Sequence, residues 1–171
     1  MPAAPESHQP YRKSDFPPQF IDVLANGVMA MSMITVITFY QPDIVDFLAA
    51  SLFGAGANLY FHESIHYIAL SRLGYDPIFD WPNSVWAPNV ALSVKEGIIH
   101  LISPQILTVI YIGILFLTNT DEIAFMVIVA IVLNLAGGFR DVAWAIRRLL
   151  WPKGHLVLVD SKGNESVSFQ K

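Results

Sequence analysis

Four long stretches of this chain carry almost no charge, and each is close to the length of a membrane-spanning helix. They cover residues 23–40, 44–70, 97–117 and 123–146. A helix of about 20 apolar residues crosses the hydrocarbon core of a bilayer, which is ~30 Å thick. Only 14% of the residues are charged, whereas a soluble domain usually has about a quarter. The sequence therefore predicts an all-α membrane protein with four transmembrane helices.

The links between these helices predict how the protein is oriented. Residues 41–43 and 118–122 are short, so the helices that they join should form antiparallel hairpins. The short links contain no Lys or Arg, and all ten basic residues lie in the tails, in the middle loop or near the opposite helix ends. By the positive-inside rule, we expect a multi-pass protein of the plasma membrane with both termini in the cytoplasm.

The segments outside the helices divide the chain into three parts. Residues 1–21 form a polar cytoplasmic tail without a convincing signal-cleavage site, residues 22–151 the four-helix domain, and residues 152–171 a cytoplasmic tail. Alternating apolar and polar residues in this last tail predict a short β-hairpin. In the middle loop, residues 87–94 alternate loosely between apolar and polar side chains. They predict either an edge strand that could accept an extended substrate peptide or an anchor at the membrane interface.

The second apolar stretch contains the sequence His62-Glu63-Ser64-Ile65-His66, an H-E-x-x-H motif. On a helix, both imidazoles reach one metal ion, and Glu63 lies beside them where a water molecule would be activated. His62 and His66 are therefore candidate zinc ligands, and Glu63 is the candidate catalytic base. Because the chain has no cysteine, a third ligand must be another histidine or a carboxylate. The alternative interpretation is a proton relay or a buried polar network that holds helices together.

Asp141 is the leading candidate for the third ligand. Asp141 and His66 each lie six residues before an arginine near a predicted helix end, so both should be about 9 Å from the cytoplasmic side. A salt bridge with a neighbouring arginine is the structural alternative for Asp141. His100, in the first turn of the third predicted helix, is the rival ligand.

Two asparagines are candidates for orienting a ligand or a substrate. Asn134 shares one face of the fourth predicted helix with Asp141, and the pair Gly137-Gly138 lies between them. These glycines predict close packing against small residues of the second helix. Asn58 lies one turn before the first histidine of the motif. It could orient that ligand, or it could make a helix-to-helix hydrogen bond.

Residues 58–169 resemble the zincin peptidase family of small integral-membrane proteins, which is similar in turn to the site-2 proteases. The resemblance is carried by the H-E-x-x-H motif, Leu73-Gly74-Tyr75, Pro104, the segment from Asn134 to Asp141, Val159-Asp160 and Gly163. It implies a zinc ion held by His62, His66 and Asp141, with Glu63 as catalytic acid and base. One departure is that site-2 proteases have a tight Asn-Pro-Asp-Gly or Leu-Asp-Gly cluster, whereas Asn134 and Asp141 are seven residues apart.

The sequence thus predicts an intramembrane zinc metalloprotease that cuts membrane proteins or peptides near the cytoplasmic face. Membrane lipids surround such a protein, and the pattern is compatible with an oligomer. The alternative is a non-catalytic metal-binding membrane protein that acts as a subunit or chaperone. A transporter is disfavoured because the four predicted helices contain no repeated half. A net charge of −4 without a basic patch argues against nucleic acid as a partner.

Overall fold

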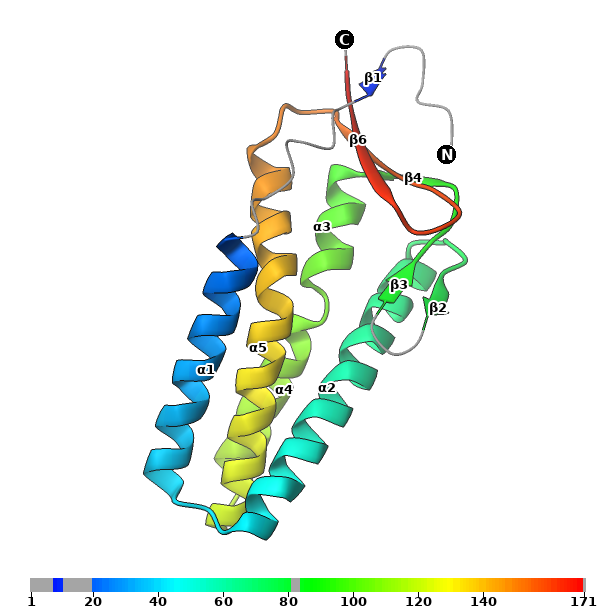
Figure 1. The fold of residues 1–171 in the computed structure, drawn as a ribbon. Coiled ribbons are helices and arrows are strands. Elements are labelled where there is room, and N and C mark those ends of the chain that lie inside the picture. The colour runs from blue at the N-terminus through cyan, green and yellow to red at the C-terminus, as the bar shows by residue number, and fades with distance from the viewer. Residues whose placement is uncertain (1–7, 11–19, 81–83, 171) are drawn as a thin grey trace. The chain divides into compact units, whose positions relative to one another are not determined.

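The computed structural model contains four candidate spans that are long and apolar enough to cross a membrane. It describes residues 8–10, 20–80 and 84–170, so the predicted polar tail of residues 1–21 lies mostly outside the described residues. The helices are α1 (Phe20–Tyr40), α2 (Ile44–Arg72), α3 (Val94–Ile102), α4 (Gln105–Leu117) and α5 (Asp121–Leu150) (Figure 1). Four long apolar segments are therefore confirmed, with ends close to the predicted ones.

The third predicted helix is interrupted, so the prediction of one continuous helix over residues 97–117 is wrong. The helix α3 ends at Ile102, and α4 begins at Gln105, directly after Pro104. Proline has no backbone N–H, and its ring clashes with the carbonyl four residues earlier. The two helices together still form one apolar segment of membrane-spanning length, Val94–Leu117.

The first of two compact units consists of Gln19–His62 and Pro104–Arg140, and we call it the helical unit. Its core lies where α1, α2 and α5 meet, and includes Ala50, Phe125 and Val129, packed by Met33, Val36, Tyr40, Phe47, Met126 and Leu133. A Cβ on Gly54 would lie 2.9 Å from Leu133 Cδ1 and 3.0 Å from Val129 Cγ1. The expectation that small residues of α2 allow close approach to α5 is confirmed at this position.

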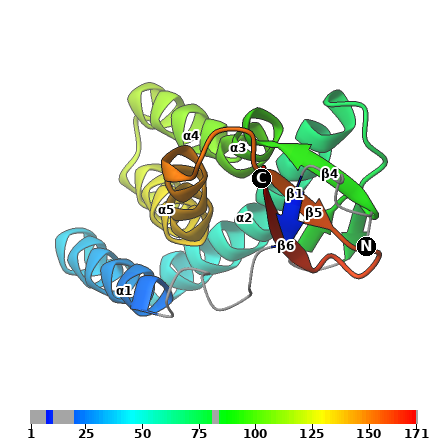
Figure 2. The ribbon, with the colours of Figure 1, turned by 90° about the horizontal axis from the view of Figure 1, so that it is seen from above.

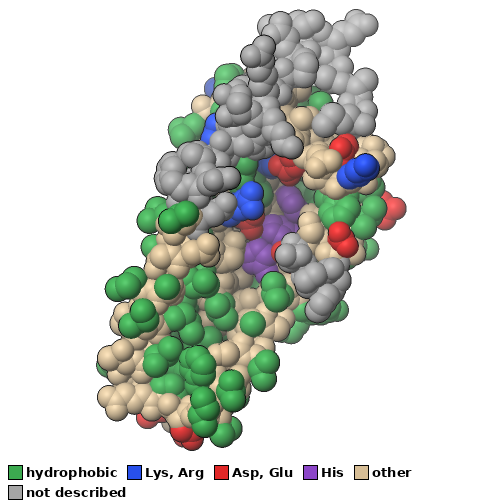
Figure 3. All heavy atoms as spheres, viewed as in Figure 1, with side chains coloured by type: hydrophobic (Ala, Val, Ile, Leu, Met, Phe, Trp, Pro, Cys, Tyr) green, Lys and Arg blue, Asp and Glu red, His purple; other side chains and the backbone are tan. Residues whose placement is uncertain are grey.

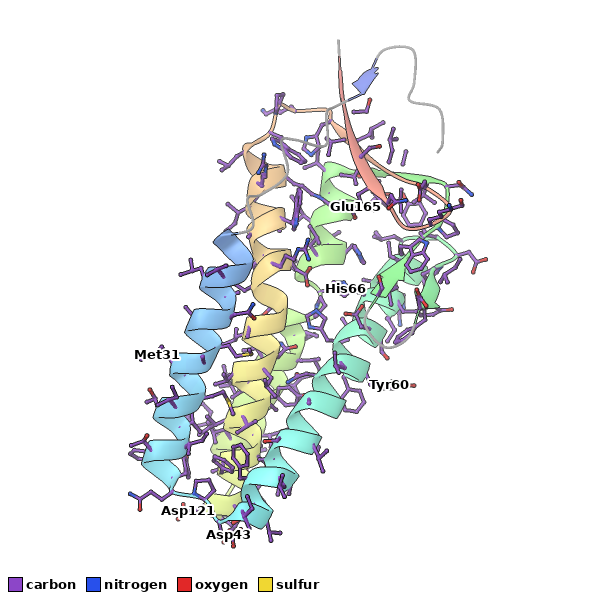
Figure 4. All side chains as sticks on the ribbon, viewed as in Figure 1. Met31, Asp43, Tyr60, His66, Asp121 and Glu165 are labelled. Carbon is purple, nitrogen blue, oxygen red and sulfur yellow. The ribbon has the colours of Figure 1, made fainter. Side chains whose placement is uncertain are left out.

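The outward surface of the helical unit is largely apolar. Leu52, Val109 and Phe116 are 75%, 67% and 85% exposed, and hydrophobic side chains cover much of the long helices in Figure 3. Asp43 and Asp121 lie together at one end of this unit (Figure 4). Apolar surface of this extent is typical of a protein that contacts lipid or another apolar partner.

The second unit contains Glu63–Ser103 and Asp141–Lys171, and we call it the sheet unit. Its antiparallel sheet has the strand order β1 (His8–Pro10), β6 (Glu165–Gln170), β5 (Leu156–Val159) and β4 (Val90–Ser93) (Figure 2). A separate hairpin is formed by β2 (Ile78–Asp80) and β3 (Ser84–Trp86). The predicted C-terminal hairpin is confirmed as β5 and β6. The strand β4 lies within residues 87–94, where an edge strand was one of the two predictions, but its pairing with β5 and the β2–β3 hairpin were not predicted.

The turn between β5 and β6 is stabilised by its own side chains. The Asp160 carboxylate accepts hydrogen bonds from the backbone N–H of Lys162 and from both the side chain and backbone of Asn164. The Asn164 hydrogen bonds hold the pKa of Asp160 below its usual value. Gly163 has a φ of +79°, and a Cβ there would lie 2.8 Å from Trp86 Cδ2. Glycine is required both by the backbone angle and by the close approach of Trp86.

The strand β4 leads directly into α3, and the junction is a capping box. The Ser93 N–H donates to Glu96 Oε2 at 2.8 Å, and the Glu96 N–H donates to Ser93 Oγ at 3.3 Å. This reciprocal pair fixes the first turn of a helix. Leu92, the residue of β4 just before Ser93, packs with Val157 and Val167 in the sheet core. The sheet therefore sets where α3 begins.

A buried ion pair connects α5 to the sheet. Arg148 is 1% exposed, and its Nη2 donates to Glu165 Oε2 at 3.0 Å. The guanidinium also lies against Gly97 of α3, where a side chain would overlap it. Breaking a buried pair of this kind is costly because it leaves an uncompensated charge. The ion pair and this contact hold α3, α5 and β6 together within the sheet unit, and α5 carries Asp141 in the same unit.

Candidate metal centre

The H-E-x-x-H motif lies on α2, which is helical without interruption from Ile44 to Arg72. His62, Glu63 and His66 each offer one donor atom, and these atoms lie within 4.8 Å of one another. Both histidines are buried. Figure 3 shows histidine side chains gathered in one place on the molecule beside acidic ones, and Figure 4 shows Tyr60, on the same helix, pointing outward. The predicted grouping of the three motif residues is confirmed.

His62 is oriented by Asn134, which lies on α5 in the same helical unit. His62 Nδ1 is 3.1 Å from Asn134 Oδ1. The Asn134 amide nitrogen donates to Thr108 Oγ1 at 2.8 Å and also lies 3.4 Å from the carbonyl of Pro104. Since the amide NH₂ serves as the donor there, Oδ1 must accept from His62. The proton of His62 is therefore on Nδ1, and its Nε2 presents a lone pair.

His66 has the same tautomer for a similar reason. Its Nδ1 is 2.8 Å from the backbone carbonyl oxygen of His100. A carbonyl only accepts hydrogen bonds, so Nδ1 carries a proton, and Nε2 faces Asp141. Metal-binding histidines typically donate their second ring N–H to a carbonyl or carboxylate, which fixes the ring and its basicity. Both histidines of the motif show this arrangement.

Pro104 explains why the His100 carbonyl can hold His66. In a continuous helix, the carbonyl of His100 would accept from the backbone N–H four residues later, at position 104. Proline has no such N–H. The carbonyl instead accepts from His66 Nδ1 and from Ser103 Oγ, at 2.8 and 2.9 Å. The helix break thus provides an acceptor for a candidate ligand.

Asp141 meets His66 inside the sheet unit. Asp141 Oδ2 is 3.3 Å from His66 Nε2. With the His66 proton on Nδ1, these two atoms are both acceptors, so a proton or a metal cation must lie between them. Two donor atoms that share a tetrahedral zinc ion at ~2.0–2.1 Å are about 3.3 Å apart. The distance fits a shared metal ion, and Asp141 remains the predicted third ligand.

His100, the alternative third ligand, contacts His66 in another way. The two rings make a tilted contact with centroids 4.5 Å apart, and the backbone carbonyl of His100, not its imidazole, makes the hydrogen bond. Within the described residues, the compact group of donor atoms contains His62, Glu63 and His66 and includes neither His100 nor Asp141, but of these two residues Asp141 is the one whose side chain faces His66 Nε2. His100 therefore serves as a support for His66 in this structure.

Asn58 makes a helix-to-helix hydrogen bond, the second of the two roles predicted for it. Its Nδ2 donates to the backbone carbonyl of Ala130 at 2.8 Å. The glycine pair on α5 does not pack against small residues of α2 as predicted, since the close neighbour of Gly138 is Gln105 of α4. A Cβ on Gly138 would overlap the side chain of Gln105, whereas a Cβ on Gly137 would meet nothing within 4 Å. Gly137 is therefore not required for close packing within the described residues.

These side chains define a candidate metal centre with imidazole and carboxylate donors. Comparisons of the chain with protein-family models, with curated proteins and with solved structures found no match. The roles of Thr108 and Gln105 were not predicted from the sequence, and Pro104 was noted only for the family resemblance. Pro104 lies four residues after His100, and this spacing is the signal that could have identified the free carbonyl.

Replacing Pro104 by alanine tests the role of the helix break. The substitution restores a backbone N–H that competes with His66 for the His100 carbonyl. We expect metal affinity to fall roughly 10- to 100-fold, the usual effect of losing the partner of a metal-binding histidine. Competition with a chelating dye measures the affinity. Ser103→Ala is the matched control, because it removes the other donor to this carbonyl without adding an N–H. Equal affinity in wild type and Pro104→Ala would contradict this role.

Proposed function

We propose that this protein is an intramembrane zinc metalloprotease that hydrolyses peptide bonds of membrane-associated or transmembrane substrates near the cytoplasmic face. The observation that carries the proposal is the shared tautomer of His62 and His66. Each ring uses Nδ1 for an acceptor inside the protein, so Nε2 is the nitrogen of each ring that would bind a metal ion. Two such nitrogens beside Glu63, with Asp141 at His66, make up the donor set of a catalytic zinc site.

The sequence supports the proposed membrane topology. The four candidate spans have the required length and apolarity. Acidic residues occupy the first turns of α2 and α5, and arginines occupy their last turns. By the positive-inside rule, this charge distribution favours a cytoplasmic position for both termini and the middle loop of a plasma-membrane protein. His66 and Asp141 lie toward the arginine-containing ends of α2 and α5, so the reaction takes place near the cytoplasmic side.

The proposed ligand set suits zinc. Imidazole nitrogens and a carboxylate oxygen are usual zinc ligands, and three protein ligands leave a fourth position open in catalytic sites. Zinc bound there would lower the pKa of a water molecule toward ~7 and polarise the scissile carbonyl. His62, His66 and Asp141 hold the ion, and Asn134 and the His100 carbonyl hold the two rings in position.

Glu63 moves the proton in the proposed reaction. Its carboxylate accepts a proton from the attacking water while the water oxygen bonds to the carbonyl carbon of the peptide. When the C–N bond breaks, Glu63 delivers this proton to the leaving nitrogen. One water is consumed, one carboxylic acid and one amine are formed, and Glu63 returns to its original state. The position of Glu63, next to His62 on α2 and inside the group of donor atoms, supports this role.

The edge strand β4 is the proposed place for the substrate backbone. A protease needs its substrate in an extended form, and an extended peptide can add to an open sheet edge. Val90–Ser93 pairs with β5 on one side and is the last strand in the order of the described sheet. The two interpretations of this segment, substrate strand and interfacial anchor, both remain predictions.

Metal removal and readdition test the proposed function. Protein purified in detergent should contain one zinc per chain by elemental analysis. It should cleave a library of internally quenched peptides with membrane-span sequences in vesicles. A chelator should abolish cleavage, and added zinc should restore it. Metal at well below one per chain would overturn the proposal. Stoichiometric zinc without cleavage would instead favour the non-catalytic metal-binding alternative.

A further inference from the structure

Gln105 is a polar residue of the helical unit that has no role in the reaction as described so far. It is the first residue of α4, directly after the break at Pro104. Its side chain lies on Gly138 of α5. A Cβ on Gly138 would overlap Gln105 Nε2 and would lie 3.1 Å from Gln105 Cδ. The missing side chain at Gly138 is therefore what makes room for this amide.

The amide of Gln105 lies beside His62. The point where a Gly138 Cβ would be is also 3.5 Å from His62 Cε1, so the glutamine amide and the Cε1 edge of the imidazole are neighbours. In the ring, Cε1 connects Nδ1 with Nε2. Because Nδ1 is turned to Asn134, the remaining nitrogen on this edge is Nε2, the proposed ligand atom. Gln105 thus lies beside the imidazole ring that carries the proposed ligand atom.

The amide nitrogen of Gln105 is buried, and within the described residues it has no hydrogen-bond partner. A buried polar group without a partner costs about 1–3 kcal/mol. A donor held in this way, next to a candidate ligand, is suited to an acceptor that arrives with the substrate.

We infer that Gln105 is a further catalytic residue, whose amide N–H donates a hydrogen bond to the carbonyl oxygen of the scissile peptide. The inference rests on the proposed function. As the oxygen of water bonds to the carbonyl carbon, negative charge develops on that carbonyl oxygen. A fixed donor stabilises the charge without reorganising, and loss of one such donor typically lowers kcat about 10²- to 10³-fold. No atom is transferred to or from Gln105, because it only donates a hydrogen bond.

Gln105→Met and Gln105→Glu test this role. Methionine nearly matches the shape of glutamine but cannot donate, and an ionised glutamate can only accept. Both variants should retain zinc at the wild-type stoichiometry. We expect kcat to fall about 10²- to 10³-fold in each, with KM changed little, because the contact strengthens in the transition state. Ile106→Ala is the control, since Ile106 is the next residue of α4 and is 55% exposed.

A second measurement separates this role from helix packing. A phosphinic peptide carries a tetrahedral centre with a negatively charged oxygen. Its Kd should rise in Gln105→Met by the same factor by which kcat/KM falls. The Kd of an uncleaved peptide, measured in the Glu63→Gln protein, should be unchanged by adding Gln105→Met. If only Gln105→Glu folds, the same comparison is made with it.

The outcomes distinguish this inference from the proposed function. A wild type that cleaves, together with Gln105 variants that cleave equally fast, overturns the role of Gln105 and leaves the protease intact. Equal weakening of the phosphinic peptide and the uncleaved peptide also overturns it, because that result indicates a packing role. A wild type that binds no zinc and cleaves nothing overturns both.

Discussion

Glu63→Gln is expected to bind zinc as wild type does and to lose cleavage. Glutamine keeps the shape of glutamate but cannot accept the proton of the attacking water, so kcat should fall by about 10²- to 10⁴-fold. Glu63 lies within the compact donor group on α2 but is not one of the three proposed ligands. Elemental analysis and a peptide-cleavage assay on the same preparation measure the two quantities.

His66→Ala is the matched comparison for Glu63→Gln. The His66 imidazole is a proposed ligand, with Nδ1 on the His100 carbonyl and Nε2 beside Asp141. Removing it should therefore abolish both zinc binding and cleavage. A Glu63→Gln protein that cleaves at the wild-type rate would refute the assignment of Glu63 as the base. A Glu63→Gln protein that loses its zinc would show that Glu63 is itself a ligand.

Asp141→Ala is expected to lose zinc, whereas His100→Ala should retain it. The Asp141 carboxylate lies 3.3 Å from His66 Nε2, a separation that suits two ligand atoms of one tetrahedral zinc ion. Loss of a ligand should weaken binding by more than the roughly 10- to 100-fold that follows loss of a supporting partner. Affinity is measured by dye competition, and cleavage should be lost in parallel.

His100→Ala is the control for Asp141→Ala because it keeps the backbone carbonyl that holds His66. It removes the ring that lies against His66, so a modest loss of zinc affinity is consistent with a supporting role for His100. Zinc retained at full stoichiometry in Asp141→Ala, but lost in His100→Ala, would reverse the roles of these two residues.

The long apolar helices and the H-E-x-x-H group could be predicted from the sequence because both depend on local information. Hydropathy gives the helices, and helix periodicity alone brings His62, Glu63 and His66 together. The equal-depth argument also placed Asp141 near His66, and the two side chains are in contact.

The contacts missed from the sequence depend on residues far apart in the chain. The pairing of β4 with β5 joins Val90–Ser93 to Leu156–Val159, and strand pairing over such a separation leaves little local signal. Thr108 and Gln105 are polar residues of the mostly apolar helix α4. Their neighbours on α5, Asn134 and Gly138, are known only from the fold. Asn134 could be identified from the sequence because it shares a helix face with Asp141. Its hydrogen bond to His62 could not be predicted in this way.

The continuity of β4 with α3 has a consequence for the C-terminal end of the chain. Removing residues from Leu156 onward would leave β4 without the strand it pairs with and would uncover Leu92, a residue of the sheet core. Because β4 passes without a loop into the helix that carries His100, clipping by a cellular protease, or a bulky affinity tag at this end, would disturb the candidate metal centre through the backbone, without touching any proposed ligand.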